Sequence, residues 1–257
     1  MASYESFASV YDLFMEDVDY EGWCRYLTDL LRRNGIHDGL VCELGCGTGT
    51  MTELLAAQGY DMIGVDASAE MLSAAQDKKD RSGSDILYLL QDMREFELYG
   101  TVRAVISVCD SMNYILEEEE LLQVFRLVNN YLDPGGLFIF DMNTPGKYGR
   151  IGDDVIAENR EEGSFIWENS YDPESGLNDY SLTLFIPEGD EGLYRRYEEL
   201  HTQRGYSLDT VRNLIDRSGL RWIGAWEAYT DREVSPESDR VLILARETEK
   251  KADDYSF

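Results

Sequence analysis

The segment with the clearest chemical potential is a glycine-rich loop, Gly45-Cys46-Gly47-Thr48-Gly49, between a short apolar run and a helix-like run. Glycine is needed where a chain turns sharply and a ligand lies against bare backbone. Asp66 follows roughly 20 residues later, at the end of the next apolar run, which is the spacing of a ribose-binding carboxylate. These residues predict a nucleoside site where a strand turns into a helix.

The loop alone does not identify the ligand, because a strand-to-helix turn without a ligand can use the same glycines. Dinucleotide enzymes carry a related fingerprint, Gly-x-Gly-x-x-Gly, whose third glycine lets helix and strand pack closely. Thr50 occupies that third position here, which argues against a nicotinamide-dependent oxidoreductase. The loop also lacks the Gly-Lys-Ser/Thr ending of a phosphate-binding P-loop. A ligand without phosphate requires neither device.

The elements that position this loop alternate along the chain. Short apolar runs that indicate strands are separated by runs in which apolar residues recur at helical spacing. Thr50 and Glu53 have the spacing of a capping box at the start of one such helix. The predicted strands are Leu40–Leu44, Met62–Val65, Ile86–Leu90, Val102–Val108 and Leu137–Phe140, and the predicted helices are Tyr4–Gly35, Thr50–Gln58, Ser68–Lys79 and Glu117–Tyr131. This alternation favours a parallel sheet covered on both faces.

The pattern changes after Pro145. Three strand-like stretches separated by turns predict an antiparallel insert, namely Ser164–Glu168, Asp179–Pro187 and Leu193–Gln203. A helix over Ser207–Arg217 and two strands without a helix between them, Trp222–Glu227 and Arg240–Ala245, close the chain and predict an antiparallel pair at one sheet edge.

The fold class that follows is α/β, with a Rossmann-like, seven-stranded, mostly parallel sheet, an antiparallel last strand and an antiparallel β insert over one edge. The expected organisation is a helical lid over 1–36, a Rossmann-like core over 37–145, the β insert as an acceptor lid over 146–206, the C-terminal part of the core sheet over 207–247, and a flexible tail over 248–257.

Composition excludes several classes of function. The net charge of -28, from 51 acidic and 23 basic residues, repels phosphate backbones and anionic lipids, so no nucleic-acid or membrane partner is expected. Four cysteines without a Cys-x-x-Cys pair, and two histidines, offer too few ligands for a structural zinc, so no metal is expected. We found no apolar run of the roughly 20 residues that cross a bilayer and no secretory signal, and reduced cysteines fit a cytoplasmic enzyme.

Further motifs at the ends of the later strands carry a family resemblance. They are Gln91-Asp92-Met93, Ser107–Tyr114 and Leu132–Asp141. Together with Glu43–Gly49 and Asp66, their order resembles that of the class I S-adenosylmethionine-dependent methyltransferases over about residues 4–143. Within that class, a bacterial small-molecule-type subfamily is similar in three further places, which are here Tyr11-Asp12, Asp17–Trp23 and His201–Ser207.

The resemblance implies that S-adenosyl-L-methionine is the cofactor and that the glycines line its methionine and ribose. Asp66 would bind the ribose hydroxyls, Glu43 would orient the amino-acid end, and Asp92 would accept a hydrogen bond from the adenine amino group. The Cys109 backbone or Asp110 would hold the methionine ammonium, although Asp110 could instead cap a loop. The cofactor-binding residues implied are Tyr11, Glu43, Gly45, Cys46, Gly47, Gly49, Asp66, Ala67, Asp92, Met93, Cys109 and Asp110.

The resemblance also implies in-line transfer of a methyl group, for which alignment and exclusion of water matter more than acid catalysis. The catalytic candidates are His201, Tyr11 and Tyr206, and Tyr114 and Trp167 are expected near the acceptor. His201 could act as a base, or could be a structural histidine of a strand. A small-molecule acceptor with a nitrogen or oxygen nucleophile is expected. A non-catalytic module that binds the cofactor, or an NAD-dependent oxidoreductase, is the alternative.

Overall fold

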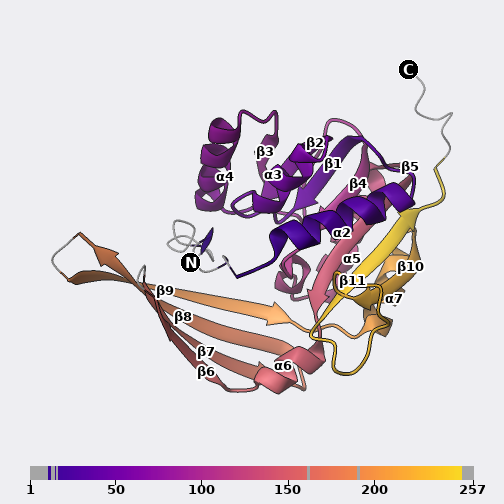
Figure 1. Cartoon of the computed structure of the whole chain (residues 1–257). Coiled ribbons are helices and arrows are strands. Elements are labelled where there is room, and N and C mark those ends of the chain that lie inside the picture. Colours follow the sequence, from indigo (N-terminus) through magenta and orange to yellow (C-terminus); the bar gives the residue numbers. More distant parts are fainter. Residues whose placement is uncertain (1–10, 13–14, 16, 161–162, 190–191, 251–257) are drawn as a thin grey trace.

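The structure is a computed structural model, and it describes residues 11–12, 15, 17–160, 163–189 and 192–250. Two sheets organise the chain (Figure 1). The larger sheet has seven strands in the order β10-β11-β5-β4-β1-β2-β3, and the smaller has four in the order β6-β7-β8-β9. The predicted tail 248–257 lies mostly outside the described residues.

The seven-stranded sheet is built mainly from parallel neighbours. Its strands are β1 (Gly39–Leu44), β2 (Tyr60–Asp66), β3 (Leu87–Leu90), β4 (Val102–Ser107), β5 (Leu132–Asn143), β10 (Leu220–Glu227) and β11 (Arg240–Glu247). The pairs β1–β2, β1–β4, β2–β3 and β4–β5 are parallel, while β11 is antiparallel to both of its neighbours, β5 and β10. The predicted fold class, with its antiparallel last strand, is therefore confirmed.

Helices cover both faces of this sheet because its strands are apolar on both sides. Successive residues of β5 alternate between two cores, with Leu137 and Ile139 in one and Phe138 and Phe140 in the other. The first core includes residues of α2 (Tyr20–Arg33) and α3 (Thr50–Ala57), and the second includes residues of α5 (Glu118–Tyr131) and α7 (Leu208–Arg217). The helix α4 (Ala69–Ser82) follows β2 and contacts β3.

The first turn of α3 differs from its prediction. The residue before the helix is Gly49, with a φ of +75°, and no side chain caps the helix there. The hydroxyl of Thr50 instead accepts a hydrogen bond from Lys78 at 2.6 Å, and Glu53 accepts one from Ser84 at 3.0 Å. The predicted capping box is therefore wrong, because both side chains bond to residues of the α4 region.

The four-stranded antiparallel sheet is formed by the segment that follows Pro145. Its strands are β6 (Val155–Asn159), β7 (Ser164–Asp172), β8 (Leu177–Glu188) and β9 (Leu193–Arg204), preceded by the short helix α6 (Pro145–Ile151). The sequence predicted three of these strands but neither β6 nor α6. The two ends of this segment lie together, since a Cβ added to Gly205 would be 3.2 Å from Pro145 Cα.

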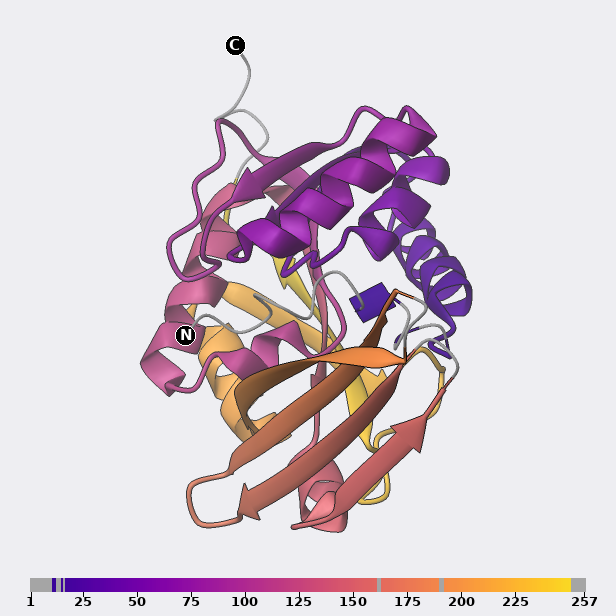
Figure 2. The same ribbon diagram turned by 90° about the vertical axis from the view of Figure 1, so that its left-hand side faces the viewer.

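This insert meets the core at the carboxyl end of β4. A short 3-10 helix, η1 (Ser111–Tyr114), follows that strand, and its Asn113 side chain donates to the Arg204 carbonyl at 2.8 Å. Residues 11–12, drawn in indigo, lie between the core and the four-stranded sheet (Figure 2). No helix among the described residues is long and apolar enough to cross a membrane.

Candidate functional site

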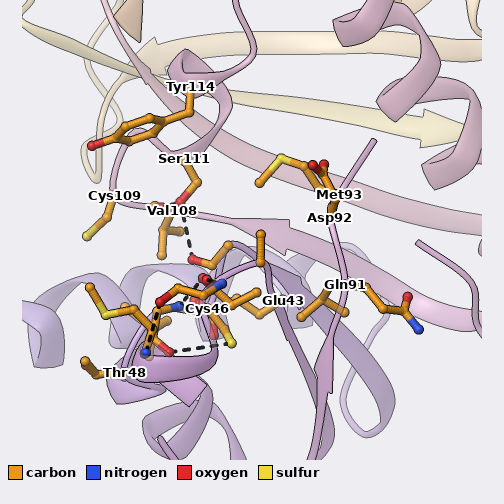
Figure 3. Close-up of a pocket in the computed structure, with 18 of the residues that line it drawn as sticks. Glu43, Cys46, Thr48, Gln91, Asp92, Met93, Val108, Cys109, Ser111 and Tyr114 are labelled. Atoms are coloured by element: carbon orange, nitrogen blue, oxygen red, sulfur yellow. Dashed lines mark hydrogen bonds between the residues drawn. The ribbon is translucent and has the colours of Figure 1, made fainter. Parts of the chain in front are cut away.

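A pocket of about 350 Å³ opens at the carboxyl ends of the parallel strands, where ligands of open α/β sheets bind (Figure 3). Its walls come from the loops that follow β1, β2, β3 and β4 and from the segment before α2. The residues that line it include Tyr11, Tyr20, Glu43, Gly45, Cys46, Gly47, Thr48, Asp66, Ala67, Ser68, Met71, Gln91, Asp92, Met93, Arg94, Cys109, Ser111, Tyr114 and Ile115.

The glycine loop is shaped by close packing on both sides. Gly45 has a φ of +69°, and an added Cβ would lie 2.6 Å from Ser111 Oγ. The backbone N–H groups of Gly45 and Cys46 both donate to the Val65 carbonyl, at 2.8 and 3.0 Å. An added Cβ at Gly49 would collide with the Tyr88 hydroxyl. A residue with a side chain at either position would therefore displace the loop or the neighbouring Ser111 and Tyr88 side chains.

Asp66 connects this loop to the end of β2. Its Oδ2 accepts from the Gly47 N–H at 2.8 Å, and its Oδ1 accepts from the Ser68 N–H at 2.9 Å. Burial raises the pKa of Asp66, and these backbone hydrogen bonds act in the opposite direction. The carboxylate is thus held by the backbone at the wall of the pocket.

Glu43 forms the floor of the pocket at the end of β1. Its side chain is buried and accepts a hydrogen bond from the Thr52 hydroxyl. Burial raises the pKa of Glu43 to about 8, and the Thr52 hydrogen bond opposes that rise. A cation placed above this carboxyl group would favour its ionised form.

Asp92 and Met93 stand where β3 ends, on the opposite wall. The guanidinium of Arg94 forks onto Asp92, with Nη2 at 2.6 Å from Oδ2 and Nε at 3.0 Å from Oδ1. This contact holds the pKa of Asp92 below its usual value. Arg94 also contacts Glu120 at 3.2 Å, so its single positive charge is shared by two carboxylates.

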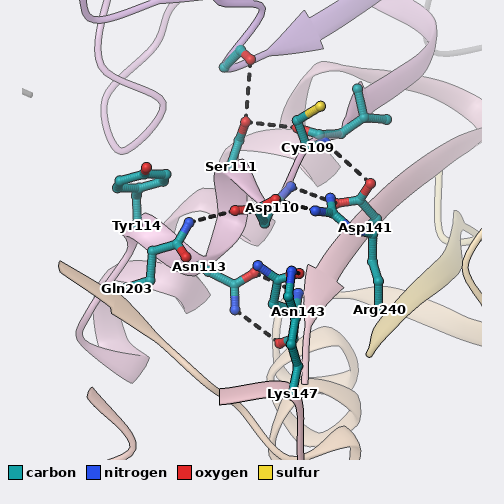
Figure 4. Close-up of polar contacts among 12 residues, drawn as sticks. Cys109, Asp110, Ser111, Asn113, Tyr114, Asp141, Asn143, Lys147, Gln203 and Arg240 are labelled. Carbon is teal, nitrogen blue, oxygen red and sulfur yellow. Dashed lines mark hydrogen bonds and ion pairs between the residues drawn. The ribbon is translucent and has the colours of Figure 1, made fainter. Parts of the chain in front are cut away.

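Cys109 and Asp110 form an unusual turn after β4, because both have left-handed backbone conformations, with φ of 56° and 53°. The buried carboxylate of Asp141 holds the turn by accepting from both N–H groups, at 3.2 and 2.7 Å. Arg240 pairs with Asp141 at 3.0 Å and with Asp110 (Figure 4). Such strained turns persist only where surrounding contacts hold them.

The structure places Cys109 on the pocket wall, whereas Asp110 lies behind it. The Asp110 carboxylate accepts from Gln203 at 2.6 Å and pairs with Arg240. Sequence reasoning missed Asp141, Arg240 and Gln203, which hold this turn. Their separation from the motif along the chain leaves no local signal, although Asp141 ends one of the motifs that carry the resemblance.

Tyrosines close the remaining side of the pocket. Tyr11, Tyr20 and Tyr114 line it, and the Tyr20 hydroxyl lies 3.4 Å from Cys109 Sγ. Burial raises the pKa of Tyr11 and of Tyr20 well above the usual value, so both phenols stay neutral. Asp12 fixes this segment to the core through Thr48, at 2.6 Å, and through Lys78, at 2.7 Å.

The remaining candidates lie outside the pocket lining. His201 is buried on β9, and its Nδ1 lies 3.2 Å from the Tyr114 hydroxyl. Tyr206 packs in the core next to α5 and α7, and its hydroxyl donates to the Ile115 carbonyl at 2.6 Å. Trp167 stacks on Tyr180 of the insert, with ring centres 4.6 Å apart. His201 thus contacts the pocket lining through Tyr114.

Comparison with known proteins identifies what this arrangement is similar to. Residues 41–136 match the model of a methyltransferase domain family. Over 246 residues the chain is 34% identical to "Putative methyltransferase GWCH70_2453" of Geobacillus sp. (strain WCH70). The aligned region covers 95% of this chain and 99% of the relative. A second relative, a dTDP-3-amino-3,4,6-trideoxy-alpha-D-glucopyranose N,N-dimethyltransferase of Streptomyces venezuelae, is 30% identical over 52% of this chain and 56% of its own length.

A solved structure agrees over the whole chain. The crystal structure of a S-adenosylmethionine-dependent methyltransferase from Clostridium acetobutylicum ATCC 824 superposes with a TM-score of 0.87 at 28% identity. The superposition covers 96% of this chain and 99% of the other, so the similarity includes the four-stranded insert as well as the core.

Proposed function

The chain belongs to the class I S-adenosylmethionine-dependent methyltransferases of the bacterial small-molecule type, and we propose that it methylates an amine nitrogen of a small molecule. The cofactor and the class of reaction follow from the family, and they replace the alternatives of an oxidoreductase or a non-catalytic module. The choice of acceptor is our proposal, and it depends on the chemistry of the pocket wall.

The residues of the pocket fit the cofactor as a cationic nucleoside. In this proposal Asp66 accepts from the ribose hydroxyls, and Glu43 lies beneath the methionine ammonium. Ala67 and Met93 lie beside the adenine, whose amino group donates to Asp92. The backbone of Gly45, Cys46, Gly47 and Gly49 lines the methionine and ribose, and the Cys109 backbone and Tyr11 close the methionine end. Asp110 acts indirectly, because its pair with Arg240 holds the Cys109 turn.

When bound, S-adenosylmethionine supplies a methyl group on a sulfonium that leaves as a neutral thioether. The protein's task is then to align the acceptor in line with that methyl group and to exclude water. Tyr11 and Tyr20 lie on the pocket wall and are buried enough to shield it. Their ring faces attract the positive charge that a sulfonium carries and that a methylated amine acquires.

The observation that carries the amine proposal is the charge of the lining. Among the described lining residues, the lone cationic side chain is Arg94, and it is balanced by Asp92 and Glu120. An acceptor that reacts through a carboxylate or carries a phosphate near the methyl group would have no partner there. Phenol rings together with carboxyl groups favour an acceptor that becomes cationic, which is a property of amines and not of hydroxyls. The relative from Streptomyces venezuelae is an N,N-dimethyltransferase of an amino sugar, which supports the same choice.

A matched pair of acceptors tests this proposal. Glucosamine and glucose differ at one position, where an amine replaces a hydroxyl, and pairs of smaller compounds such as ethanolamine and ethylene glycol differ in the same way. We expect transfer of a radiolabelled methyl group to the amine of a pair and not to its hydroxyl partner. Transfer to hydroxyl partners alone would overturn the amine proposal. The variant Asp66→Ala is the control for transfer that does not use the pocket.

A further inference from the structure

A row of three polar side chains leads from the pocket wall into the insert. Tyr114 of η1 lines the pocket, and its hydroxyl lies 3.2 Å from His201 Nδ1 on β9. The other ring nitrogen of His201, Nε2, lies 3.7 Å from a carboxylate oxygen of Glu199. His201 and Glu199 are two residues apart on one strand, so they point to the same face of the sheet.

Both members of the row that lie behind Tyr114 are shielded from water. His201 is 2% exposed and Glu199 is 5% exposed. Burial lowers the pKa of His201, while the charges of Glu199 and Asp110 act against that shift. The imidazole is therefore neutral near pH 7 and can accept one proton.

The neighbours of His201 decide which of its nitrogens carries the proton. The negative charge of Glu199, 3.7 Å from Nε2, favours a proton on that nitrogen without a hydrogen bond to it, and a proton there leaves the lone pair of Nδ1 towards the Tyr114 hydroxyl. The Tyr180 hydroxyl also contacts that of Tyr114, at 2.7 Å, and the Tyr180 ring stacks on His201 with centres 4.7 Å apart. The stacked ring of Tyr180, rather than its hydroxyl, orients the imidazole.

A purely structural role would not favour these residue types. Burying a histidine and a glutamate costs free energy that apolar residues of similar size would not. The hydroxyl of the other candidate phenol, Tyr206, donates to a backbone carbonyl, which cannot take a proton at neutral pH. Tyr114 instead leads from the pocket to a group that can.

We propose that Tyr114 takes the proton that the acceptor amine loses, while His201 takes the proton of Tyr114. The nitrogen lone pair forms the new bond to the methyl carbon, and the electron pair of the broken sulfur–carbon bond remains on the thioether sulfur. The N–H proton moves to Tyr114 Oη as the Oη proton moves to His201 Nδ1, and Glu199 stabilises the imidazolium. Tyr114 is then a catalytic residue, and His201 and Glu199 are positioning residues. This assignment depends on the proposed amine acceptor.

The first test observes the imidazole without any acceptor. The chain has two histidines, His37 and His201, and His37 is exposed. Ring ¹⁵N NMR of the enzyme bound to S-adenosylhomocysteine therefore gives two sets of signals, and His37→Gln assigns them. We expect His201 to carry its proton on Nε2, and Tyr114→Phe to shift its Nδ1 resonance. The proposal is overturned if His201 carries its proton on Nδ1, or if Tyr114→Phe leaves the chemical shift of Nδ1 unchanged.

The second test measures whether the row is used, with glucosamine and ethanolamine as probe acceptors. We expect Tyr114→Phe to lower kcat by about 100-fold or more, with KM changed only a few-fold. His201→Asn keeps a hydrogen-bonding atom near the Nδ1 position but cannot take the proton. It should lower kcat by at least about tenfold and abolish the fall of kcat at low pH that protonation of His201 causes.

Two controls separate this role from a structural one. Tyr180→Phe removes a hydroxyl that contacts Tyr114 but keeps the ring, so kcat should change only a few-fold. Added imidazole should restore activity to His201→Gly, and the restored activity should rise with the concentration of neutral imidazole. A pH profile of His201→Asn that equals the wild type overturns the proposal. If the wild type transfers the methyl group to glucose or ethylene glycol and to neither amine, the proposed amine acceptor is wrong. The NMR experiment alone then tests whether Tyr114 and His201 are arranged to pass a proton.

Discussion

At the scale of single residues, two carboxyl groups beside the same loop are held differently. Asp66 receives two backbone N–H groups, from Gly47 and Ser68, whereas Glu43 is buried with one hydroxyl, that of Thr52. Backbone donors stabilise an ionised carboxylate, and burial favours a neutral one. The two groups therefore respond differently to substitution and to pH.

Asp66→Ala should weaken binding of S-adenosylhomocysteine by at least about tenfold. The substitution removes a charged hydrogen-bond acceptor and also frees the Gly47 N–H that shapes the loop. Asp66→Asn keeps one oxygen acceptor and should have an intermediate effect. Isothermal titration calorimetry measures both. Binding by Asp66→Ala that equals the wild type would show that the carboxylate does not contact the ligand.

Glu43→Gln should change how stability depends on pH. The pKa of Glu43 is raised in the folded protein to about 8, so the folded state keeps a proton that the unfolded state has already lost. Its contribution to stability is therefore fully present below the unfolded pKa near 4.5 and is lost as pH rises through about 8. When both proteins are free of cofactor, the free energy of unfolding of the wild type should fall by about 2 kcal/mol or more, relative to that of Glu43→Gln, between about pH 5 and pH 8.

Urea unfolding of both proteins at several pH values measures this difference. The comparison cancels the effect of the other 50 or so acidic groups, because only Glu43 changes between the two proteins. Parallel stability curves would mean that Glu43 is ionised across this range. Glutamine is the matched substitution, since its side-chain oxygen can still accept from Thr52.

The residues of the pocket differ in how far the sequence could predict them. The glycine loop and Asp66 form local motifs at a fixed spacing, so their side of the pocket was predictable. The support of Asp110 was not, because Arg240 lies 130 residues away in sequence and comes close only when β11 pairs with β5. The fork of Arg94 onto Asp92 was equally hidden, since an arginine two residues from an aspartate is common on exposed surfaces.

At the scale of elements, the charged group of Asp12 attaches the described part of the segment before α2 to the core. Asp12 accepts from Thr48 and pairs with Lys78 of α4, and Tyr11 beside it lines the pocket. Asp12 is about half exposed, so solvent screens this contact. The contact therefore contributes modestly, and its effect should be visible in ligand binding more than in folding.

Lys78→Met should weaken binding of S-adenosylhomocysteine by about threefold, which corresponds to the roughly 0.7 kcal/mol of a partly exposed ion pair. The effect should be smaller in 500 mM salt than in 50 mM salt, because screening weakens the pair. It should also be smaller in the background of Asp12→Asn, where Lys78→Met removes only the contacts with Thr48 and Thr50. Calorimetry with the four proteins of this cycle gives the coupling. Lys79→Met is the matched control, since it removes the same charge from the next position of α4; an equal effect there would contradict the role of the pair.

Elements with strong periodicity were predictable and weakly apolar ones were not. The helices α5 and α7 and the strands β7, β8 and β9 were predicted close to their observed positions, because their apolar residues recur at the period of their structure. The strand β6 escaped prediction because it is a short edge strand whose Val155 and Ile156 are exposed. The sequence does not predict the helix α6, because the pattern of strands and helices changes after Pro145, its first residue, although proline is common at that position of a helix.

At the scale of the whole molecule, the two sheets contribute different parts of the proposed active site. The described residues that line the pocket lie from Tyr11 to Ile115, whereas His201 and Glu199, which lie behind Tyr114, come from the insert. The insert leaves the core at Pro145 and returns at Gly205, and these two residues are in contact. A fold tolerates the insertion or removal of a segment better when the two ends of that segment lie close together.

A variant that joins Pro145 to Gly205 through two glycines, without residues 146–204, should therefore fold and bind S-adenosylhomocysteine within about fivefold of the wild type. Asp110 would lose Gln203 but keep Arg240, and Asn113 would lose the Arg204 carbonyl but keep Asn143. The turn after β4 therefore keeps most of its support. Methyl transfer to the probe amines should fall by at least about tenfold, because His201 and Glu199 are gone. Calorimetry and radiolabelled transfer separate the two functions, with His201→Asn as the full-length comparison. A folded variant that no longer binds the nucleoside would show that the insert also forms the cofactor site.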